Sequence, residues 1–280
     1  MNSEYQQQFN PDFSGQTVID CLAKDSPFSK QQLKAFMQNG CVWLQTIKQA
    51  KPNRIRRAKK TLNLTDKLFF YYNAKVMESR ITAPSLVADE TSFSVWYKPK
   101  GVLCQGSKWG DHTTINRWIE MHYLFNGNSR PAIIVHRLDK DTDGLMLIAH
   151  SLQAAKQLTQ LFSERKIEKK YQARVVGKFH QETTFDSNIE GKTAITHAKL
   201  IEYNASENTS LLAINIETGR KHQIRQHLSA AGFPIVGDRL YGKPCENIDL
   251  QLTSVFLKLK LDDIRYQYTL PAKLAQVPKF

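Results

Sequence analysis

The ten residues His136-Arg137-Leu138-Asp139-Lys140-Asp141-Thr142-Asp143-Gly144-Leu145 place three carboxylates at alternate positions between two apolar runs. Those runs, over 132–135 and 145–149, have the composition of buried strands. Charged groups are costly to place beside a core unless they have a partner. Loops held at the ends of rigid strands commonly carry binding and catalytic groups. The stretch is therefore either a charged hairpin loop without chemistry or part of a functional site.

The three carboxylates and Gly144 also match the first half of an EF-hand calcium loop. The second half of that pattern is missing, because Leu147 has no side-chain oxygen and His150 stands where a bidentate Glu is needed. The flanking runs also predict strands, whereas an EF-hand requires helices. Calcium binding is therefore disfavoured, which leaves an inert loop and a catalytic loop as the alternatives.

The composition is that of a globular protein with room for two domains. The chain has 280 residues, of which 41% are hydrophobic and 10% aromatic. The first ten residues are polar and predict a tail rather than a signal peptide, and no apolar run reaches the length of a membrane span. We expect a cytoplasmic protein with free thiols at the four widely spaced cysteines, Cys21, Cys41, Cys104 and Cys245.

The net charge of +13 indicates a polyanionic partner, above all a nucleic acid. The alternative is a basic protein without any such partner. The charge is clustered within 48–60, a stretch that contains no acidic residue. Such a patch makes phosphate contacts that weaken steeply with salt. The basic residues of the patch are Lys48, Lys51, Arg54, Arg56, Arg57, Lys59 and Lys60, of which we expect Arg54, Arg56, Arg57 and Lys59 to contact RNA.

A small α+β domain is predicted over 14–75. Ser29 is a good N-cap and Asn39-Gly40 a good helix end. The expected elements are helices over 17–23 and 29–38 and strands over 41–44 and 67–72.

This order resembles the S-four-type (alpha-L) RNA-binding domain. The resemblance is carried by the helix segment SKQQLK at 29–34, the Asn39-Gly40 turn and the strand entry LTDKL at 64–68. It implies that the domain holds an RNA backbone, although the segment 45–57 departs from the short hairpin of that family and leaves its RNA contacts open. A small helical cap that binds no RNA is the alternative.

The segment 76–91 is polar and predicts a linker, after which a second domain is expected over 92–280. Ser151 begins a helix with Leu152, Ala155, Leu158, Leu161 and Phe162 on one face, and a further helix is expected over 222–230. The expected strands are 93–97, 132–135, 145–149, 171–176, 194–203, 211–216 and 254–259. The fold class is therefore α+β, a mixed but largely antiparallel sheet with flanking helices.

Three segments of the second domain together resemble the RluA-type pseudouridine synthases: HRLDKDTDGL at 136–145, KKYQARVVG at 169–177 and GRKHQIRQHL at 219–228. The run KPKG at 98–101 and the turn GDRLYG at 237–242 also match that family, so that the resemblance covers about 93–259. It implies the pseudouridine synthase fold and the isomerisation of uridine in RNA, an intramolecular reaction that needs neither cofactor nor metal.

The resemblance also implies roles for individual residues. Asp139 is the catalytic carboxylate, which attacks the ribose carbon or stabilises electron deficiency there. Arg225 is the cation that keeps it ionised in a partly buried pocket, and Tyr171 is the ring that stacks on the uracil. Arg137 either fills the space that a flipped base vacates or makes a structural salt bridge.

The matched motifs place four further residues about the substrate RNA: His136, Arg220, Lys221 and His222. For His136 and His222, as for Gly144, a role in shaping the site is expected. Asp143 stands where the family has Ser or Thr, and we expect it to face solvent or to meet Lys140. Asp141 is expected to be a solvated loop acid.

The expected function is an RNA pseudouridine synthase, and its target is either large-subunit ribosomal RNA or transfer RNA. A monomer without membrane contact is expected. A catalytically silent RNA-binding or ribosome-assembly factor is the alternative that Asp143 prompts. A glycosidase or nuclease is disfavoured, because no motif places the second carboxylate that a glycosidase requires.

Overall fold

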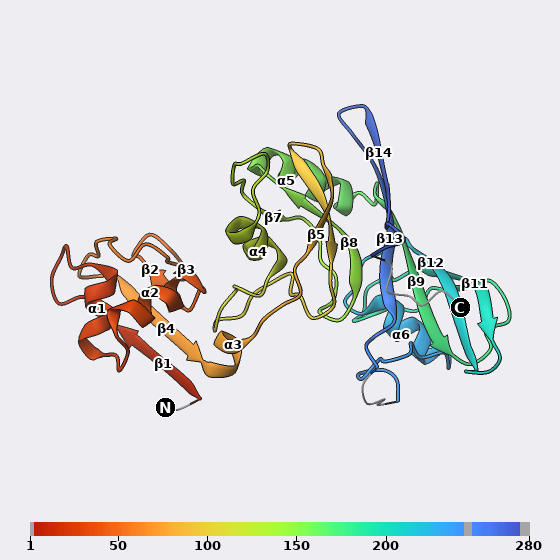
Figure 1. The fold of residues 1–280 in the computed structure, drawn as a ribbon, viewed down its shortest axis with the longest axis horizontal. Helices are drawn as coiled ribbons and strands as arrows, with labels where there is room; N and C mark the ends of the chain where they lie inside the picture. Colours follow the sequence, from red (N-terminus) through yellow and green to blue (C-terminus); the bar gives the residue numbers. More distant parts are fainter. Residues whose placement is uncertain (1–2, 244–247, 275–280) are drawn as a thin grey trace. The chain divides into compact units, whose positions relative to one another are not determined.

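The computed structural model describes residues 3–243 and 248–274, and the chain forms two compact units (Figure 1). The N-terminal unit comprises Met1–Ile81 and Gln105–Trp118, and the C-terminal unit comprises Thr82–Cys104 and Ile119–Phe280. The segment 105–118 thus belongs to the N-terminal unit although it lies within the sequence of the other. Cys245, predicted to be a free thiol, lies outside the described residues.

The N-terminal unit is a four-stranded antiparallel sheet, in the order β1-β4-β2-β3, whose one face is covered by helices. The core between sheet and helices is apolar, with Leu22 and Leu33 from the helices packed against Leu68 and Phe70. Its elements are β1 (Glu4–Phe9), α1 (Val18–Asp25), α2 (Lys30–Gln38), β2 (Val42–Gln45), β3 (Asn53–Arg54), β4 (Lys67–Asn73) and α3 (Ala74–Glu78).

Helix α2 begins within one residue of the prediction and ends where predicted, whereas α1 begins one residue later and ends two residues later than predicted. The Ser29 hydroxyl accepts a hydrogen bond from the Gln32 backbone, and the Gln32 side chain accepts one from the Ser29 backbone, which completes a capping box. Gly40 follows α2 with φ +84°, a conformation that favours glycine. The predicted strands over 41–44 and 67–72 correspond to β2 and β4, within one residue at each end.

Two expectations about segment boundaries were wrong. Residues 4–9 are not a tail but β1, which pairs with β4 from Glu4↔Asn73 to Phe9↔Leu68. The three glutamines of this strand are all exposed, Gln7 included although it lies opposite the buried Phe70, so that of the strand only Phe9 is fully buried. The expected linker over 76–91 contains the end of α3 and all of β5.

The C-terminal unit is built on a mixed sheet that is antiparallel except at one junction, which confirms the predicted fold class. The main path of strands runs β10-β11-β12-β9-β13-β8-β6-β5, with β14 paired to β13 and β7 to β8. The strands are β5 (Ser85–Asp89), β6 (Phe93–Lys98), β7 (Ile133–Ile134), β8 (Asp143–Ala149), β9 (Glu168–Val176), β10 (Thr183–Phe185), β11 (Thr196–Asn204), β12 (Thr209–Ile216), β13 (Leu252–Leu261) and β14 (Ile264–Thr269). The helices are α4 (Ile115–His122), whose first residues belong to the other unit, α5 (Leu152–Ser163) and α6 (Gln223–Ala230).

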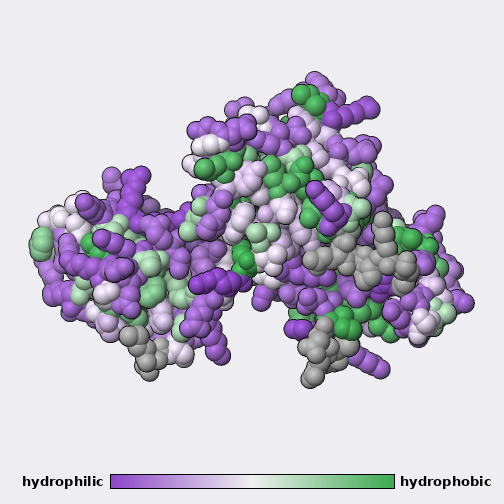
Figure 2. Space-filling view, viewed as in Figure 1, coloured by the Kyte–Doolittle hydropathy of each residue, from purple (hydrophilic) through white to green (hydrophobic). Residues whose placement is uncertain are grey.

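The helix α5 begins after Ser151, whose hydroxyl accepts a hydrogen bond from the Ala154 backbone as predicted. Leu158 is fully buried, but Leu152, expected on the same apolar face, is 82% exposed because it lies in the first turn. No helix of residues 3–243 and 248–274 is long and apolar enough to cross a membrane. Hydrophilic residues predominate on the face shown in Figure 2.

The parallel junction between β8 and β13 explains the glycine of the 136–145 motif. Asp143 and Gly144 lie opposite Thr253 and Ser254 in register. Gly144 has φ +114°, and a Cβ there would lie 2.2 Å from the Ser254 carbonyl oxygen. Glycine is therefore required at the point where the strand leaves the acidic turn.

Candidate active site

Asp139 lies in the turn that precedes β8, and its side chain is 27% exposed. The turn is closed by a hydrogen bond of 3.2 Å from the Thr142 backbone N–H to the Asp139 carbonyl oxygen. The carboxylate is thus held at the end of a buried strand while it stays open to solvent on one side.

The backbone of this turn is held in place by Lys98, the last residue of β6. The buried ammonium donates hydrogen bonds to the carbonyls of Pro99 (3.1 Å), Val102 (2.9 Å) and Lys140 (3.2 Å). The Gly101 backbone N–H donates to the same Lys140 carbonyl (2.9 Å). Burial lowers the pKa of Lys98 to about 8. The run KPKG therefore fixes the backbone next to Asp139, a role that the sequence did not suggest.

Cys104 supports the other side of the same turn. Its thiol lies 3.3 Å from the Leu138 carbonyl oxygen, and the Leu138 backbone N–H donates to its sulfur at 3.4 Å. Burial raises the pKa of the thiol, so Cys104 stays protonated and can donate. Cys21 and Cys41 are also free and buried.

Arg225, in α6, faces Asp139 as the sequence predicts. Its Nη1 lies 3.5 Å from Asp139 Oδ2, while Nε and Nη2 each donate a 2.7 Å hydrogen bond to Asp238. The Arg225 and Asp238 side chains are 6% and 0% exposed. Burial favours the neutral acid, but Arg225 and the backbone N–H groups of Leu240 and Tyr241 outweigh it and lower the pKa of Asp238. The fork-to-fork pair fixes the guanidinium and leaves Nη1 for Asp139.

His222 approaches Asp139 from the start of α6, where its backbone is left-handed (φ 53°). Its Nε2 lies 3.8 Å from Asp139 Oδ1, and its Nδ1 lies 3.0 Å from the Tyr241 hydroxyl oxygen. Burial lowers the pKa of His222 although Asp139 opposes that shift, so the imidazole is mainly neutral at pH 7. His222 thus lies between Asp139 and the Tyr241 hydroxyl, within contact distance of both.

Tyr171 lies on β9 opposite Ser254 of β13, and the residue is 8% exposed. Burial, and next the negative charge of Asp139, raise the pKa of its phenol above the ordinary value. The phenol is therefore protonated at neutral pH and can donate a hydrogen bond. The structure thus brings Tyr171 and Arg225 to Asp139 from segments far apart in sequence.

The expectation for Asp143 was wrong. Its carboxylate is fully buried and accepts hydrogen bonds from the hydroxyls of Tyr97 (3.0 Å) and Thr253 (2.7 Å). These residues lie on the strands that flank β8, and the sequence does not show which hydroxyls meet at this position. Asp141 is exposed, as expected. The three carboxylates therefore have separate surroundings and do not gather around a common ion.

The described contacts of His136 lie within the domain. The Leu147 backbone N–H donates a 2.9 Å hydrogen bond to its Nε2, and its ring stacks on Phe162 at 4.5 Å. Burial, and next the charge of Lys169, lower the pKa of His136 to about 3. The imidazole is thus neutral and serves as an acceptor within the domain.

Gln223 of the third motif holds the loop before α6, and His227 connects α6 to β11. Gln223 accepts hydrogen bonds from the Thr218 hydroxyl (2.6 Å) and the Arg220 backbone (3.0 Å), and His227 Nδ1 lies 3.0 Å from the Thr196 hydroxyl. The Arg220 side chain donates to a carbonyl oxygen within the unit. Lys221 and Arg137 are exposed.

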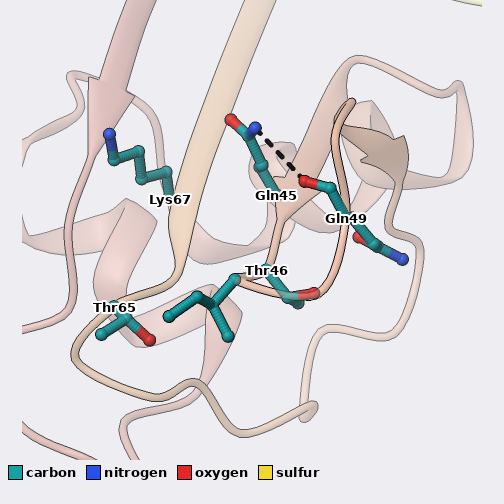
Figure 3. A pocket seen from close by; sticks show the side chains of 6 residues that line it. Gln45, Thr46, Gln49, Thr65 and Lys67 are labelled. Atoms are coloured by element: carbon teal, nitrogen blue, oxygen red, sulfur yellow. Dashed lines mark hydrogen bonds between the residues drawn. The ribbon is translucent and has the colours of Figure 1, made fainter.

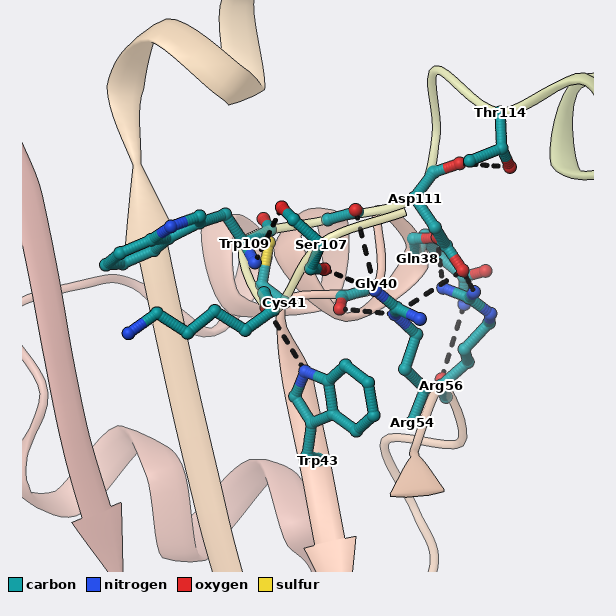
Figure 4. A network of polar contacts seen from close by, with 12 residues as sticks. Gln38, Gly40, Cys41, Trp43, Arg54, Arg56, Ser107, Trp109, Asp111 and Thr114 are labelled. Carbon is teal, nitrogen blue, oxygen red and sulfur yellow. Dashed lines mark hydrogen bonds and ion pairs between the residues drawn. The ribbon is translucent and has the colours of Figure 1, made fainter. Parts of the chain in front are cut away.

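The basic patch of the N-terminal unit is divided in two. Arg56 pairs with Asp111 at 2.5 Å, and Arg54 donates to the carbonyls of Gly40 and Ser107 (Figure 4). The cations of Arg54 and Arg56 therefore hold the segment 105–118, which the sequence could not reveal. Arg57 and Lys59 are exposed, as an RNA contact requires.

Comparison with known proteins identifies related chains. A sequence profile described as RNA pseudouridylate synthase matches residues 92–230. An "uncharacterized RNA pseudouridine synthase" of Aquifex aeolicus is 30% identical over 254 residues, which cover 84% of this chain and 79% of the relative. The "ribosomal large subunit pseudouridine synthase D" of Pseudomonas aeruginosa is 33% identical over 172 residues, or 56% of this chain and 53% of the relative.

The chain spans about half the length of several of the curated relatives that it matches. Among solved structures, "Human RNA Pseudouridylate Synthase Domain Containing 1" shares the fold with a TM-score of 0.59 and 23% identity. That match covers 69% of this chain and 86% of the human one.

Proposed function

Since this chain belongs to the RNA pseudouridine synthase family, we propose that it isomerises uridine to pseudouridine in RNA, with Asp139 as the catalytic carboxylate. The observation that carries the proposal is the fixed approach of Arg225 to Asp139 beside the protonated Tyr171. This arrangement sets a cation beside a carboxylate at an open site, as covalent catalysis or charge stabilisation at a ribose carbon requires.

The reaction needs no co-reactant. The bond between C1′ and N1 breaks while Asp139 attacks C1′ or stabilises its positive charge, and the detached uracil then turns over. A new bond forms between C1′ and C5, and it displaces the Asp139 carboxylate where that group has bonded to C1′; the proton at C5 is lost, and N1 gains a proton. Atoms and electrons balance within the nucleotide, so the resemblance implies neither cofactor nor metal.

Tyr171 is the partner of the base in this proposal. We assign its ring the role of stacking on the uracil, and its hydroxyl is protonated because burial and Asp139 disfavour the phenolate. The phenol therefore enters the reaction as a hydrogen-bond donor rather than as a base. The exposed Arg137 stands two residues before Asp139, where its planar cation can replace the base that leaves the RNA stack.

The substrate that we propose is ribosomal RNA of the large subunit, with transfer RNA as the alternative. The name of the Pseudomonas aeruginosa relative favours ribosomal RNA, and the exposed cations Arg57 and Lys59 suit either polyanion. Mapping pseudouridines in total RNA with and without the gene decides between the two. The same comparison locates the target uridine, and we propose that the enzyme acts as a monomer.

The proposal is tested by Asp139→Asn, which keeps the shape of the side chain and removes its charge. We expect loss of tritium release from RNA labelled at C5 of uridine, with an unchanged melting temperature. Asp141→Asn is the matched control, because Asp141 is an exposed acid of the same turn. Turnover by Asp139→Asn at the wild-type rate would refute the assignment.

The alternative of a catalytically silent RNA-binding factor was suggested by Asp143 alone. Asp143, the residue that prompted it, is held by Tyr97 and Thr253 and is compatible with a functional Asp139. RNA binding by the wild-type protein without any pseudouridine formation would favour that alternative.

A further inference from the structure

We propose that the outer face of the N-terminal sheet binds single-stranded RNA by stacking bases on exposed aromatic rings. This inference rests on the RNA substrate proposed above and names a second RNA-binding surface. Three aromatic residues define the face. Phe69 of β4 lies opposite Trp43 of β2 and opposite Gln8 of β1, and Tyr71 lies opposite Gln6. Directly opposed residues of an antiparallel pair point to the same side of the sheet.

The other side of the same strands forms the core of the unit. Val42, Leu68 and Phe70 are fully buried against α1 and α2. Trp43, Phe69 and Tyr71 alternate with these residues and remain partly exposed. The segment 105–118 covers part of this face, since the Trp43 indole N–H donates to the Lys108 carbonyl at 3.1 Å and Trp109 meets Tyr71 edge to face. Large rings are costly to leave in contact with water, so a row of partly exposed rings beside this segment indicates a binding surface.

Cations flank the rings at one end of the face. Lys108 Nζ lies 5.2 Å from the ring centre of Tyr71 and 4.5 Å from that of Trp109, and the Trp109 ring meets Tyr71 edge to face. The Arg54 guanidinium lies 4.3 Å from the ring centre of Trp43. Lys108 joins a positive charge to aromatic rings, the combination that holds a nucleic acid strand without reading its sequence, whereas Arg54 is engaged by the Gly40 and Ser107 carbonyls.

A polar pocket lies at the other end of the face (Figure 3). Lys67 and Gln45, opposite each other in the register of β4 and β2, both line it. The remaining lining residues are Thr46, Ile47, Gln49 and Thr65. Ammonium, amide and hydroxyl groups are suitable donors for phosphate and ribose oxygens. A strand of RNA could thus place backbone groups at Lys67 and at Lys108 with bases on the rings between them.

The spacing and the charge favour single-stranded RNA over a second copy of the chain. Phe69 and Tyr71 are two residues apart on one strand, about 6.8 Å, and sheets with such rings bind two or three unstacked bases. A duplex keeps its bases stacked and cannot use the rings. The N-terminal unit also carries fifteen Lys and Arg against seven Asp and Glu, so two copies would repel each other while RNA is attracted.

The test measures the Kd of the full-length protein for a labelled single-stranded oligouridylate and for an RNA duplex of the same length. Removing a stacking ring costs about tenfold in Kd or more. We expect Phe69→Ala and Tyr71→Ala to weaken binding of the single strand by at least about tenfold each. The conservative variants Phe69→Tyr and Tyr71→Phe should bind as the wild type does.

Phe13→Ala is the matched control, because Phe13 is an exposed aromatic residue of the same unit outside its strands. Wild-type affinity of Phe69→Ala and Tyr71→Ala for the single strand would overturn the proposal, as would an equal loss for the duplex. A sedimentation experiment that shows a dimer in the wild type and a monomer in Tyr71→Ala, with RNA binding unchanged, would assign the face to a second copy instead.

The outcome is separable from that of the proposed function. If the wild type binds the single strand through these rings but makes no pseudouridine, the catalytic assignment fails and the sheet surface stands. If the wild type releases tritium while both alanine variants bind like the wild type, the sheet surface alone is refuted. Melting temperatures measured in parallel identify a variant that fails to fold, for which the folded Phe69→Leu replaces the alanine variant.

Discussion

Arg225 reaches Asp139 with one nitrogen, at 3.5 Å, because Asp238 holds the other two at 2.7 Å each. The buried pair thus fixes the position of the Arg225 guanidinium, which faces Asp139, the proposed catalytic carboxylate. A side chain that never approaches the substrate should then influence the rate, since small displacements of a charge within an active site are costly.

We predict that Asp238→Asn lowers kcat of pseudouridine formation by roughly 100-fold, with a smaller change in KM. The amide can accept only one of the two hydrogen bonds, and Arg225 loses its buried counter-charge. The loss of a partner from a buried ion pair also destabilises the fold, by about 3–5 kcal/mol. Kinetics therefore have to be measured at a temperature at which the variant is folded.

Asp238→Glu is the control that separates the effect of the negative charge at residue 238 from the effect of its position. It keeps the negative charge but displaces the fork, so that stability should recover more than kcat. A kcat of Asp238→Asn equal to that of the wild type would show that Asp139 does not depend on the orientation of Arg225.

A second prediction concerns Asp143, which accepts hydrogen bonds from Tyr97 and Thr253 inside the sheet. Asp143→Ala leaves two buried hydroxyls without this acceptor and should cost about 1–3 kcal/mol of unfolding free energy. Urea denaturation measures the loss. Asp141→Ala, at the exposed acid two residues earlier, should change stability by less than about 0.5 kcal/mol. Equal stabilities of the two variants would contradict the structural role of Asp143.

A third prediction separates the two halves of the basic patch. Arg57→Gln and Lys59→Gln should each weaken RNA binding and reduce the slope of log Kobs against log salt by about one phosphate contact. Arg56→Gln should chiefly destabilise the segment 105–118, because Arg56 is paired with Asp111. Kd values measured at several salt concentrations distinguish these effects. A slope unchanged in Arg57→Gln and Lys59→Gln would mean that their side of the domain faces away from RNA.

The sequence predicted the elements whose signals are local. The Ser29 and Ser151 caps, with apolar residues at helical spacing after them, located α2 and α5 to within one residue. The motifs likewise indicated that Tyr171 and Arg225 would join Asp139, because their pattern resembles that of a known family. The alternation in β1 was less informative, since its exposed positions are glutamines and its core contact is Phe9 at the end.

The features that escaped prediction depend on partners distant in sequence. Asp143 meets Thr253, 110 residues away, and Arg56 meets Asp111, 55 residues away. Nothing near Asp143 identifies the hydroxyls that surround it, so a charged residue in an acidic turn suggested exposure. The role of Lys98 was hidden for the same reason, because the Lys140 carbonyl that it holds lies 42 residues further along the chain.

The last prediction follows from His136, whose pKa burial lowers to about 3 while that of an unfolded histidine is about 6.5. Above pH 6.5 neither state binds the proton, and the full stability is present. As the pH falls below 6.5 the unfolded chain takes up a proton that the folded protein excludes, so unfolding becomes more favourable, down to about pH 3. Between pH 6.5 and pH 5 this difference in proton uptake lowers the free energy of unfolding by about 2 kcal/mol.

Urea denaturation of the wild type and of His136→Gln at pH 7.5 and pH 5 tests this account. Glutamine has no proton to gain but keeps an acceptor for the Leu147 backbone N–H. His136→Gln should therefore be less stable than the wild type at pH 7.5, because it loses the stacking on Phe162, and should lose about 2 kcal/mol less on acidification. The other histidines are common to both proteins and cancel in the comparison. If the stability of the two proteins changed with pH in parallel, His136 would take up its proton as readily in the folded protein as in the unfolded chain. Its environment would then not be the one described.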